Sequence, residues 1–473
     1  MSVLEDKRRY KIELFDEEVL REYDIRGKFE KNLTLNTAYT LGLSFGNILS
    51  NKSKYKNIAV GYDGRITSPP LHKALCAGLD DSGLNVKSIG LCPTPMLYFA
   101  IHHLKMDAGI MVTGSHNPPE YNGFKMVVNN KPFYSRDILG LQNVAKRLIN
   151  KITLKKGNIS NINILNDYSQ RISRDIKIKK KIRVAWDPGN GSVGVVIRKI
   201  LGKIRNLENF VINEEVDGNF PNHHPDPTIE KNLVQIQNLV KKNKCDLGLA
   251  FDGDGDRLGI VDNNGKVIWA DRYMILLTEE ISKLYKNPNI IMDVKSSKVF
   301  FDEVLKMGCK PLMYKTGHSV IKDKMKDLNS PLAGEMSGHI MYKDNFYGHD
   351  DAFYVALRFL QIISKRKEPL SEIMESYPNT FSTPETRIEV IESRKFDIVK
   401  EITDRLKKRK LDVVSIDGIR VESQYGWWGI RASNTQNALT VRAEANDKVN
   451  LKEFTENIEK ELKMSGVEFR FFS

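Results

Sequence analysis

The sequence has no run of about 18 consecutive apolar residues, which is the length that a helix needs to span a bilayer. Its first nine residues mix charges of both signs and lack the apolar core of a secretory signal peptide. These two absences argue against a membrane protein and against export through a signal peptide.

Cysteine is scarce and scattered. The four cysteines, Cys76, Cys92, Cys245 and Cys309, form no C-x-x-C pair. This spacing indicates neither a zinc cluster nor a disulfide framework, and a reducing cytoplasm is the expected location.

What is present is typical of a globular protein. Hydrophobic residues make up 41% and charged residues 28% of the 473 residues, which excludes a disordered chain. A chain of this length is expected to form two to four domains of roughly 100 to 150 residues each. The net charge of +13 is compatible with a nucleic acid, an anionic membrane surface or a small acidic substrate as partner.

The two basic runs do not favour nucleic acid. Residues 407–410 end an apolar pattern of helical spacing, which predicts a helix over 394–410 with cations at the negative end of its dipole. Residues 177–183 alternate with isoleucines, which predicts a strand, and they include no aromatic residue that could stack on a base. We expect neither a nucleic acid nor a membrane as partner.

One order of elements occurs three times: an apolar strand, a polar loop, a helical stretch and a later strand or loop rich in polar residues. The copies run from 58–61 to the loop at 113–118, from 182–186 to the loop at 252–257, and from 290–294 to the loop at 334–339. Alternating strands and helices predict α/β domains with mixed, largely parallel sheets. Ligands bind beyond the C-terminal ends of such strands, where all three loops are expected.

The pattern changes after about residue 380. Strand-like stretches at 382–391 and 411–421 flank the predicted helix, and a polar loop at 429–435 precedes another strand and a final helix near 451–463. This order predicts a smaller α+β domain. The expected domains are 1–164 with the loop at 113–118, 165–266 with the loop at 252–257, 267–378 with the loop at 334–339, and 379–473 with the loop at 429–435.

The acidic loop predicts a metal site. Asp252, Asp254 and Asp256 alternate with glycines, so three carboxylates can turn toward one hard cation while the glycines supply the bends. An EF-hand would need Gly at its sixth position and Glu at its twelfth, where this chain has Arg257 and Asn263. Few protein ligands suit magnesium, which keeps positions for water and phosphate, although a solvated acidic turn is the simpler alternative.

The serine loop predicts a nucleophile. Ser115 follows an apolar strand, where a short hydroxyl can be presented to a cleft, and the surrounding residues do not match the G-x-S-x-G pattern of hydrolases. His116 is either a base for this serine or a structural histidine, because adjacent side chains usually point apart. A phosphoryl group on Ser115 could be neutralised by the cation at the aspartates together with Arg257 and Lys125.

Several other polar residues are candidates on their chemistry. Lys125 and His339 could transfer protons to and from sugar hydroxyls, although a single lysine is more often surface charge. Glu335 and Ser337 offer an acceptor and a donor two positions apart, which suits vicinal hydroxyls. The loop that begins at Arg431 combines a guanidinium, two hydroxyls and an amide, which suits a phosphate, or is a polar turn.

A dinucleotide-binding enzyme is an alternative. Residues 189–194 match G-x-G-x-x-G after a strand, and Glu214 lies about 20 residues further on. However, Asp187 and Pro188 separate the strand from the glycines. In addition, hydride transfer does not require a loop of three aspartates, so the acidic loop would have no function.

Together these motifs resemble the α-D-phosphohexomutase family, and within it the bacterial phosphomannomutase/phosphoglucomutase branch. The resemblance covers essentially the whole chain and is carried by residues 23–27, 113–119, 217–227, 252–257, 315–318, 335–339 and 431–435. It implies three related α/β domains and a smaller fourth domain around a central cleft. It also implies that Ser115 is a phosphoserine and that one magnesium ion per chain is bound by Asp252, Asp254, Asp256 and Ser115.

The resemblance also assigns the other candidates. Arg26, Lys125, Arg257, His318 and His339 match positions near the reacting group. Glu335 and Ser337 match positions that hold sugar hydroxyls. The positions that hold the non-reacting phosphate are matched by Tyr23, Lys295, Arg431, Ser433, Asn434 and Thr435.

The implied activity is reversible phosphoryl transfer between the 1- and 6-positions of mannose and/or glucose phosphates. It proceeds through phosphoserine and a hexose 1,6-bisphosphate, which is both intermediate and activator. The expected partners are small-molecule hexose phosphates, and the expected state is a cytoplasmic monomer.

Two other functions stay open. Phosphoglucosamine mutases have Gln at the position of Met336 and commonly Ala at that of Gly114, so both residues favour the mannose/glucose branch. A non-catalytic sugar-phosphate-binding protein is expected to have lost Ser115 or an aspartate. One departure from the family is Gln436 and Asn437, where Thr-Pro is frequent, which puts phosphate affinity in doubt.

Overall fold

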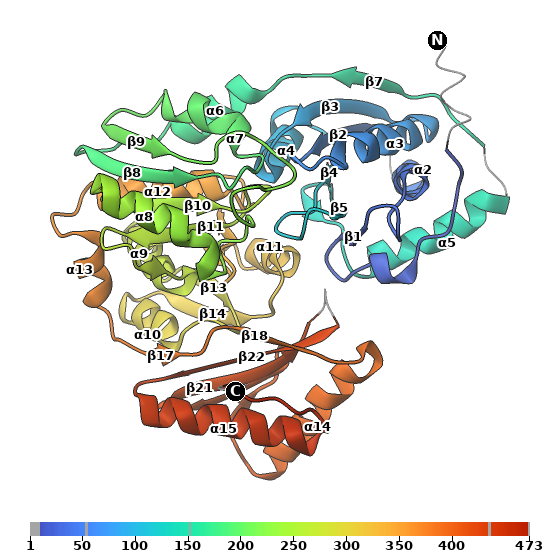
Figure 1. Cartoon of the computed structure of the whole chain (residues 1–473). Helices are drawn as coiled ribbons and strands as arrows, with labels where there is room; N and C mark the ends of the chain where they lie inside the picture. The colour runs from blue at the N-terminus through green and yellow to red at the C-terminus, as the bar shows by residue number, and fades with distance from the viewer. Residues whose placement is uncertain (1–9, 53–54, 151–152, 434–436, 472–473) are drawn as a thin grey trace. The chain divides into compact units, whose positions relative to one another are not determined.

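The computed structural model describes residues 10–52, 55–150, 153–433 and 437–471. The chain forms two compact units, shown with their elements in Figure 1. The first unit comprises residues 1–270 and 337–371, and the second comprises 271–336 and 372–473. Within the described ranges, no helix combines the length and the apolar character that crossing a membrane requires.

The first sheet of the first unit has the order β1-β5-β4-β2-β3-β7, with β6 beside β5. Strands β4, β2, β3 and β7 are parallel, whereas β5 runs antiparallel to both β4 and β1. The strands are β1 (Ile25–Lys28), β2 (Asn57–Tyr62), β3 (Asn85–Leu91), β4 (Ala108–Val112), β5 (Tyr121–Val128), β6 (Lys131–Pro132) and β7 (Asn158–Asn161). The helices are α2 (Leu35–Lys52), α3 (Ser68–Asp81), α4 (Thr94–His103) and α5 (Arg136–Asn150).

The second sheet of this unit has the order β12-β11-β10-β8-β9, with β10, β8 and β9 parallel. Its elements are α6 (Leu165–Ser173), β8 (Ile182–Asp187), α7 (Gly194–Leu201), β9 (Leu207–Val211), α8 (Val234–Asn243), β10 (Leu247–Phe251), β11 (Leu258–Asp262) and β12 (Val267–Ile268). Residues 337–371 add β16 (Ile340–Tyr342) and α12 (Ala352–Ile363). Phe353 of α12 stacks on Trp186 and on Phe251, with ring centroids 5.4 Å apart in both pairs. This aromatic contact packs the segment 337–371 against the second sheet.

The second unit begins with a parallel set in which β13 lies between β14 and β15. Its elements are α9 (Ala270–Leu284), β13 (Asn289–Asp293), α10 (Lys298–Lys306), β14 (Lys310–Tyr314), α11 (His318–Asp327) and β15 (Leu332–Gly334), and α13 (Leu370–Glu375) follows α12 along the chain.

Single 3-10 turns of the two units are η2 (Glu17–Val19), η3 (Glu230–Leu233) and η4 (Glu392–Arg394).

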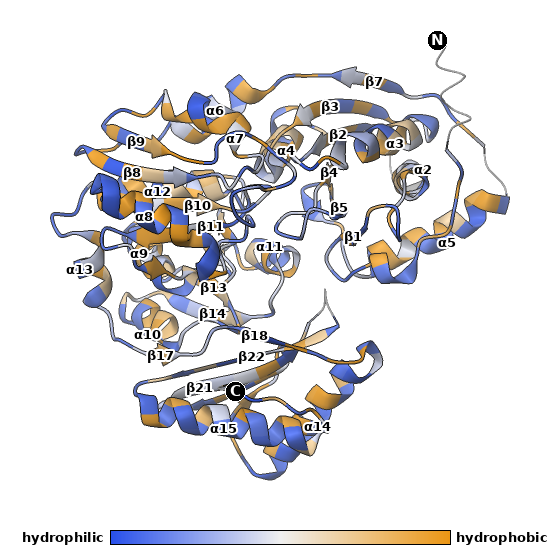
Figure 2. Cartoon of the chain, in the orientation of Figure 1, coloured by the Kyte–Doolittle hydropathy of each residue, from blue (hydrophilic) through white to orange (hydrophobic). Residues whose placement is uncertain are grey.

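The C-terminal part of this unit is an antiparallel sheet of order β17-β22-β21-β20-β19, with β18 beside β22. Its elements are β17 (Phe381–Ser382), β18 (Thr386–Glu389), α14 (Lys395–Lys408), β19 (Val413–Val414), β20 (Ile419–Ser423), β21 (Gly426–Ala432), β22 (Ala438–Ala445) and α15 (Lys448–Met464). Ile402, Leu406, Ile458 and Leu462 of the two helices are fully buried in one core with the sheet. Figure 2 shows hydrophilic and hydrophobic residues mixed along α14 and α15, as amphipathic helices require.

The predicted threefold repeat is confirmed by the strand orders β4-β2-β3, β10-β8-β9 and β15-β13-β14. In each copy the first strand lies between the second and the third, and all three are parallel. The α/β class with mixed sheets and a smaller α+β part is therefore confirmed as well.

The strand predicted over 177–183 was wrong for residues 177–181, because β8 begins only at Ile182. The preceding residues are irregular, and the backbone amides of Lys177 and Lys179 donate to Gln361 and Ser364 at the end of α12. Ile178 is buried. The alternation of lysine and isoleucine therefore reflects packing of a linker and does not reflect strand pairing.

Helices α2 and α3 approach each other closely at two glycines. A Cβ atom at Gly42 would lie 2.4 Å from the Leu75 carbonyl oxygen, and one at Gly78 would lie 2.1 Å from the Tyr39 carbonyl oxygen. Protein atoms essentially never meet at such distances, so a side chain at either position requires the helices to separate.

We expect Gly78→Ala to lower the free energy of unfolding by about 1–3 kcal/mol, the usual cost of overpacking. Gly140→Ala in α5 is the matched control, because nothing lies within 4 Å of its added Cβ. Removal of a helical glycine there should instead raise the stability by up to about 1 kcal/mol. Urea unfolding followed by circular dichroism measures both, and equal midpoints for the two variants would contradict the close helix contact.

Candidate active site

The serine loop and the acidic loop meet within the first unit. Ser115 follows β4 and Asp252 follows β10, each at the C-terminal end of its parallel strand. The Ser115 hydroxyl donates to Oδ2 of Asp252 over 2.7 Å, and both side chains are buried. Two loops that are 137 residues apart therefore form a single site, as the strand-end rule predicts.

The acidic loop concentrates negative charge in the interior. Asp252, Asp254 and Asp256 are each fully buried, and one oxygen of each lies within 4.8 Å of those of the other two. Glycine is required between them, because a Cβ at Gly253 would lie 2.5 Å from the Ser115 carbonyl oxygen and Gly255 has a φ of +74°.

The carboxylates are held by local donors. Oδ1 of Asp252 accepts the backbone amides of Asp256 and Arg257, both over 3.1 Å. Thr94 and Thr113 donate to Oδ2 of Asp254 over 2.5 and 3.1 Å. Burial and the neighbouring aspartates raise the pKa of Asp252 well above its ordinary value.

Lys125 on β5 supplies the nearest positive charge. Its ammonium donates to Asp254 over 2.7 Å and to Asp256 over 2.5 Å. Burial favours the neutral amine, but the aspartates outweigh it and raise the pKa of Lys125. Burial likewise opposes ionisation of Asp254, yet Lys125 holds the pKa of that carboxyl below its ordinary value.

The donor set fits a hard divalent cation. Oδ1 of Asp254 and of Asp256 are buried and accept no hydrogen bond from the described residues. Three carboxylates converge without a sulfur or imidazole ligand among them, and such oxygen sites suit magnesium or calcium. The first unit therefore contains an acidic site able to hold a metal ion.

The backbone at Ser115 is in the left-handed region, with a φ of +48°. Such a conformation costs a residue with a Cβ about 1–2 kcal/mol, so the surrounding contacts must hold it. The Ser115 amide donates to Thr113 Oγ1 over 2.8 Å. The same backbone turn brings Nδ1 of His116 to 3.2 Å from the Ser115 hydroxyl, so these adjacent side chains do not point apart.

Arg26, Arg257 and His339 also belong to the first unit. Arg26 on β1 donates to the Gly114 carbonyl and pairs with Asp24. Arg257 donates from Nε to Nε2 of His339 over 2.9 Å, and Nδ1 of His339 lies 3.0 Å from Asp350. Nδ1 of His339 also lies 3.4 Å from Asp256, so this imidazole stands close to two buried carboxylates.

The remaining residues predicted in the first unit lie in bends and turns. Tyr23 occupies the bend before β1, next to Asp24, and is partly exposed. Ser337 occupies the turn before β16 and is also partly exposed.

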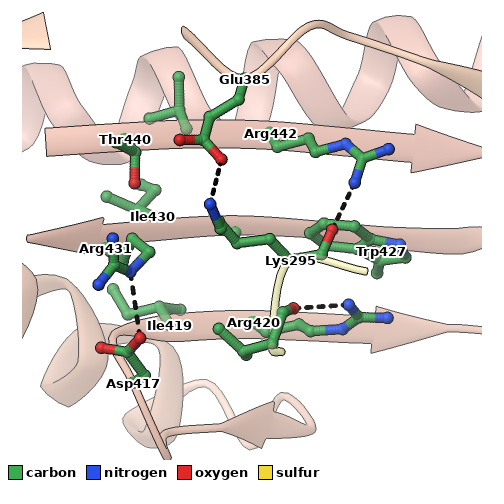
Figure 3. A pocket seen from close by; sticks show the side chains of 13 residues that line it. Lys295, Glu385, Asp417, Ile419, Arg420, Trp427, Ile430, Arg431, Thr440 and Arg442 are labelled. Carbon is green, nitrogen blue, oxygen red and sulfur yellow. Dashed lines mark hydrogen bonds and ion pairs between the residues drawn. The ribbon is translucent and has the colours of Figure 1, made fainter. Parts of the chain in front are cut away.

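Two candidates of the second unit, Lys295 and Arg431, line a pocket (Figure 3). Lys295 follows β13 and donates to Glu385 over 2.6 Å, while Arg431 on β21 donates to Asp417 over 3.2 Å. The pocket is lined by Val294, Lys295, Glu385, Asp417, Ile419, Arg420, Trp427, Gly429, Ile430, Arg431, Thr440, Val441 and Arg442. Burial opposes ionisation of Glu385, but Lys295 lowers the pKa of that carboxyl to about 2.

The loop after β15 is also anchored within the second unit. Glu335 is buried and accepts the Gly317 amide over 2.7 Å, directly before His318 opens α11. Ser433 is buried at the end of β21 and its amide donates to Ala438. The predicted phosphate ligands Asn434 and Thr435 lie outside the described residues.

Sequence reasoning missed Asp63 and Thr94. Asp63 accepts the Thr113 hydroxyl over 2.8 Å and the Gly114 amide over 3.0 Å, so it holds the serine loop. It follows β2, and the rule that polar residues gather at strand ends could have found it. Thr94 opens α4 and had no distinguishing signal.

The glycine-rich segment at 189–194 has a structural task. A Cβ at Gly191 would lie 2.7 Å from the Gly253 carbonyl oxygen, and the Ser192 amide donates to that oxygen over 2.9 Å. These glycines let the segment pack closely against the acidic loop. This packing accounts for the G-x-G-x-x-G match, which therefore no longer favours a dinucleotide site.

A serine hydroxyl beside a buried acidic metal site, flanked by lysine and arginine, is the arrangement that phosphoryl-transfer chemistry requires. Domain models of phosphoglucomutase/phosphomannomutase match the chain in succession: alpha/beta/alpha domains I, II and III at residues 17–149, 166–265 and 269–381, and the C-terminal domain at 385–461. The chain belongs to the phosphoglucomutase/phosphomannomutase family.

Individual relatives agree with this assignment. A phosphomannomutase/phosphoglucomutase of Pseudomonas syringae is 41% identical over 445 residues, which is 94% of this chain and 95% of that protein. A phosphoglucomutase of Neisseria gonorrhoeae is 37% identical over 90% of this chain and 93% of its own length. The crystal structure of a family protein from Burkholderia thailandensis matches with a TM-score of 0.89 and 35% identity, covering 96% of this chain and 98% of that one.

We expect Asp256→Asn to weaken magnesium binding by at least about tenfold, because a hard cation loses a charged oxygen ligand. Titration calorimetry of the dephosphorylated protein with magnesium chloride measures the affinity. Asp262→Asn is the control, since Asp262 is also buried in this sheet region but accepts the amides of Asn264 and Lys266. Equal affinities of the Asp256 variant and the parent protein would refute the assignment of the acidic site.

Proposed function

We propose that this chain moves a phosphoryl group reversibly between the 1- and 6-positions of mannose and glucose phosphates, with Ser115 as the carrier. The observation that carries the proposal is the 2.7 Å contact between the Ser115 hydroxyl and Asp252 inside a cluster of three buried carboxylates. Membership of the family and its relatives named as phosphomannomutase/phosphoglucomutase support the same reaction.

The reaction consists of a donation and a return. In the donation, an oxygen of the sugar bonds to the phosphorus on Ser115, the bond from phosphorus to Oγ breaks, and the sugar hydroxyl loses its proton to a base. The product is a hexose 1,6-bisphosphate, and the freed Ser115 oxygen takes up a proton. After the bisphosphate turns over, Oγ loses that proton and bonds to the other phosphorus, the bond from that phosphorus to the sugar oxygen breaks, and the sugar oxygen takes up a proton. Both steps pass through a similarly charged transition state, so the same groups can serve both.

Lys125, Arg26, Arg257, His318 and His339 are the proposed groups around the reacting phosphoryl. The contacts of Lys125 with Asp254 and Asp256 and that of Arg257 with His339 support a set of donors next to Ser115. Magnesium, one ion per chain, would be held by the three aspartates and the Ser115 oxygen and would neutralise the phosphoryl charge. His339, whose Nδ1 faces Asp350, is a candidate for proton transfer.

The non-reacting phosphate is proposed to bind in the pocket of the second unit, at Lys295, Arg431 and Ser433. Lys295 donates to Glu385 and Arg431 donates to Asp417 in this pocket, and both cations can exchange a carboxylate partner for a phosphate. The same subsite would include Asn434, Thr435 and Tyr23. Glu335 and Ser337 are proposed to hold the sugar hydroxyls.

The proposal extends to the organisation of the protein. The domains proposed are 1–164, 165–266, 267–378 and 379–473, and the matched family segments support a division into four. The enzyme is proposed to be a monomer in the cytoplasm that uses hexose 1,6-bisphosphate as intermediate and activator. The four cysteines, all buried and outside any disulfide, support a reducing environment.

A non-catalytic sugar-phosphate-binding protein is disfavoured, because such a protein has no need to bury Ser115 against three carboxylates. Keeping that charge cluster is costly unless a cation and a phosphoryl group use it. Phosphoglucosamine mutase remains the second candidate within the same chemistry, and the choice of sugar separates the two.

Ser115→Ala should abolish incorporation of labelled phosphate from glucose 1,6-bisphosphate and lower kcat by at least roughly a thousandfold, because no other oxygen can carry the group. Ser169→Ala, which removes a buried hydroxyl bonded to the Asn166 carbonyl in α6, should label as the parent protein does. Substantial turnover by the Ser115 variant would reject this serine as the carrier.

For sugar choice, we expect kcat/KM values for mannose 1-phosphate and glucose 1-phosphate within about tenfold of each other, because groups that read only hydroxyls 3 and 4 do not distinguish the C2 epimers. Glucosamine 1-phosphate should be used at least about tenfold less well, because Met336 stands where phosphoglucosamine mutases have Gln. Coupled assays with the three sugars measure this, and a preference for the amino sugar would contradict it.

A further inference from the structure

A single buried guanidinium holds the serine loop from behind. Nη2 of Arg65 donates to the carbonyl oxygens of Ser115 and Asn117 over 2.8 and 2.5 Å. Its Nη1 donates to those of Pro118 and Tyr121 over 2.6 and 3.0 Å. The side chain of Arg65 is only 1% exposed, so these bonds form away from competing water. Four carbonyl groups of one short loop are thus gathered on one planar donor.

Asp63 completes a frame with Arg65. Its carboxylate lies 3.3 Å from Nε of Arg65 and accepts the Thr113 hydroxyl and the Gly114 amide. Asp63 therefore binds donors that precede Ser115, while Arg65 binds acceptors at and after it. The ion pair fixes the loop on both sides of the serine.

The segment 217–227, which the sequence analysis singled out without a task, covers this frame. The guanidinium carbon of Arg65 lies 5.2 Å from the centre of the Phe220 ring, a cation–π distance. A Cβ at Gly218 would lie 2.8 Å from the Cα of Arg65, so the segment is in tight contact. His224 of the same segment donates from Nε2 to the His116 carbonyl over 2.5 Å.

We propose that Arg65 is a positioning residue that holds Ser115 in its left-handed backbone conformation and so directs its oxygen at Asp252. The proposal rests on the proposed role of Ser115 as carrier. The left-handed backbone at Ser115 turns its hydroxyl toward Asp252. The Arg65 bonds to the carbonyl oxygens of residues 115, 117, 118 and 121 hold that turn. The guanidinium of Arg65 donates to carbonyl oxygens of the serine loop, so it acts chiefly through the position of that loop, and its charge also acts on Asp254.

The frame also explains Gly114. A Cβ at this position would lie 2.2 Å from Nε and 2.3 Å from Cζ of Arg65. A fully buried guanidinium enclosed by Asp63, Phe220 and the loop has no room to move aside. Glycine before the serine is therefore a consequence of Arg65 in this chain, independent of the sugar that is used.

The first test compares Arg65→Ala with the parent enzyme. Because an error of about 1 Å in the position of a reacting group can cost about 100-fold, kcat should fall by about that factor. KM for the hexose phosphate should stay within about threefold, since Arg65 is not among the residues proposed to hold the sugar. Guanidinium ion at millimolar concentration should restore part of kcat, whereas Arg65→Lys should recover less, because an ammonium cannot donate to four carbonyls in a plane.

Arg358→Ala is the matched control. Arg358 is likewise buried, pairs with Asp344 over 2.8 Å and lies 4.5 Å from the Tyr342 ring, but it contacts no part of the serine loop. Both variants should melt at lower temperature, and only Arg65→Ala should lose kcat per folded molecule and regain it with guanidinium. An equal loss of kcat in the two variants, or no guanidinium rescue, would overturn the proposal.

A second test uses Gly114→Ala. In the parent enzyme this change should lower kcat about as much as Arg65→Ala, because the methyl group clashes with the guanidinium and forces the serine loop away from it. In the Arg65→Ala background it should add less than about threefold, since contacting residues are not additive. Fully multiplicative losses would contradict the coupling.

Labelling of Ser115 separates the two proposals. If the parent protein takes up no phosphate from labelled glucose 1,6-bisphosphate, the proposed function fails whatever Arg65 does. If the parent labels and Arg65→Ala labels at the same rate, only the positioning role fails. Slower labelling of Arg65→Ala than of Arg358→Ala supports it.

Discussion

The main physical constraint on the site is the mutual repulsion of three carboxylates that are buried side by side. Asp252, Asp254 and Asp256 have no exposed surface, and charges in such an environment are costly unless they are compensated. The Lys125 ammonium and the amides of the acidic loop compensate part of the charge. Burial and repulsion raise the pKa of Asp252, while Lys125 holds that of Asp254 low, so neighbouring carboxyls have opposite shifts. A divalent cation held by the three carboxylates would complete this compensation.

The threefold repeat places an aspartate at the end of the first strand of every copy: Asp63 after β2, Asp187 at the end of β8 and Asp293 at the end of β13. All three are buried. Asp63 accepts the Gly114 amide of the serine loop, and Asp293 accepts the Met336 amide of the loop after β15 over 3.1 Å. In the middle copy Asp187 instead accepts the Gly189 amide and pairs with His223. In the first and third copies this aspartate therefore anchors the polar loop after the later strand, whereas in the middle copy it holds other residues.

The two units divide the work by charge. The first unit gathers anionic groups to which a cation and a transferable phosphoryl group can be added. The pocket of the second unit instead contains cations, among them Lys295, which pairs with Glu385 and Asp293, and Arg431, which pairs with Asp417. Their carboxylate partners keep these flexible side chains ordered. Binding of an anion in the pocket would therefore cost less side-chain conformational entropy.

The sequence by itself determined the local order of the chain. Apolar strands such as Ala108–Val112 and Leu247–Phe251, and the polar loops that follow them, were predictable because strand periodicity and loop composition are local properties. Parallel strands bring their C-terminal ends together, so the meeting of Ser115 with Asp252 followed from that order. The same local reasoning failed at 177–181, where an alternating pattern belongs to a packed linker.

Only the tertiary structure decided which side chains meet. Nothing near Arg65 in the sequence indicates that its guanidinium reaches residues 115–121, and nothing near His339 indicates that it faces Arg257, which is 82 residues away. These contacts depend on how the sheets pair and on which rotamers the packing allows. Composition and spacing along the chain contain no information on either, so the chemistry of the loops could be predicted from sequence whereas the frame that holds them could not.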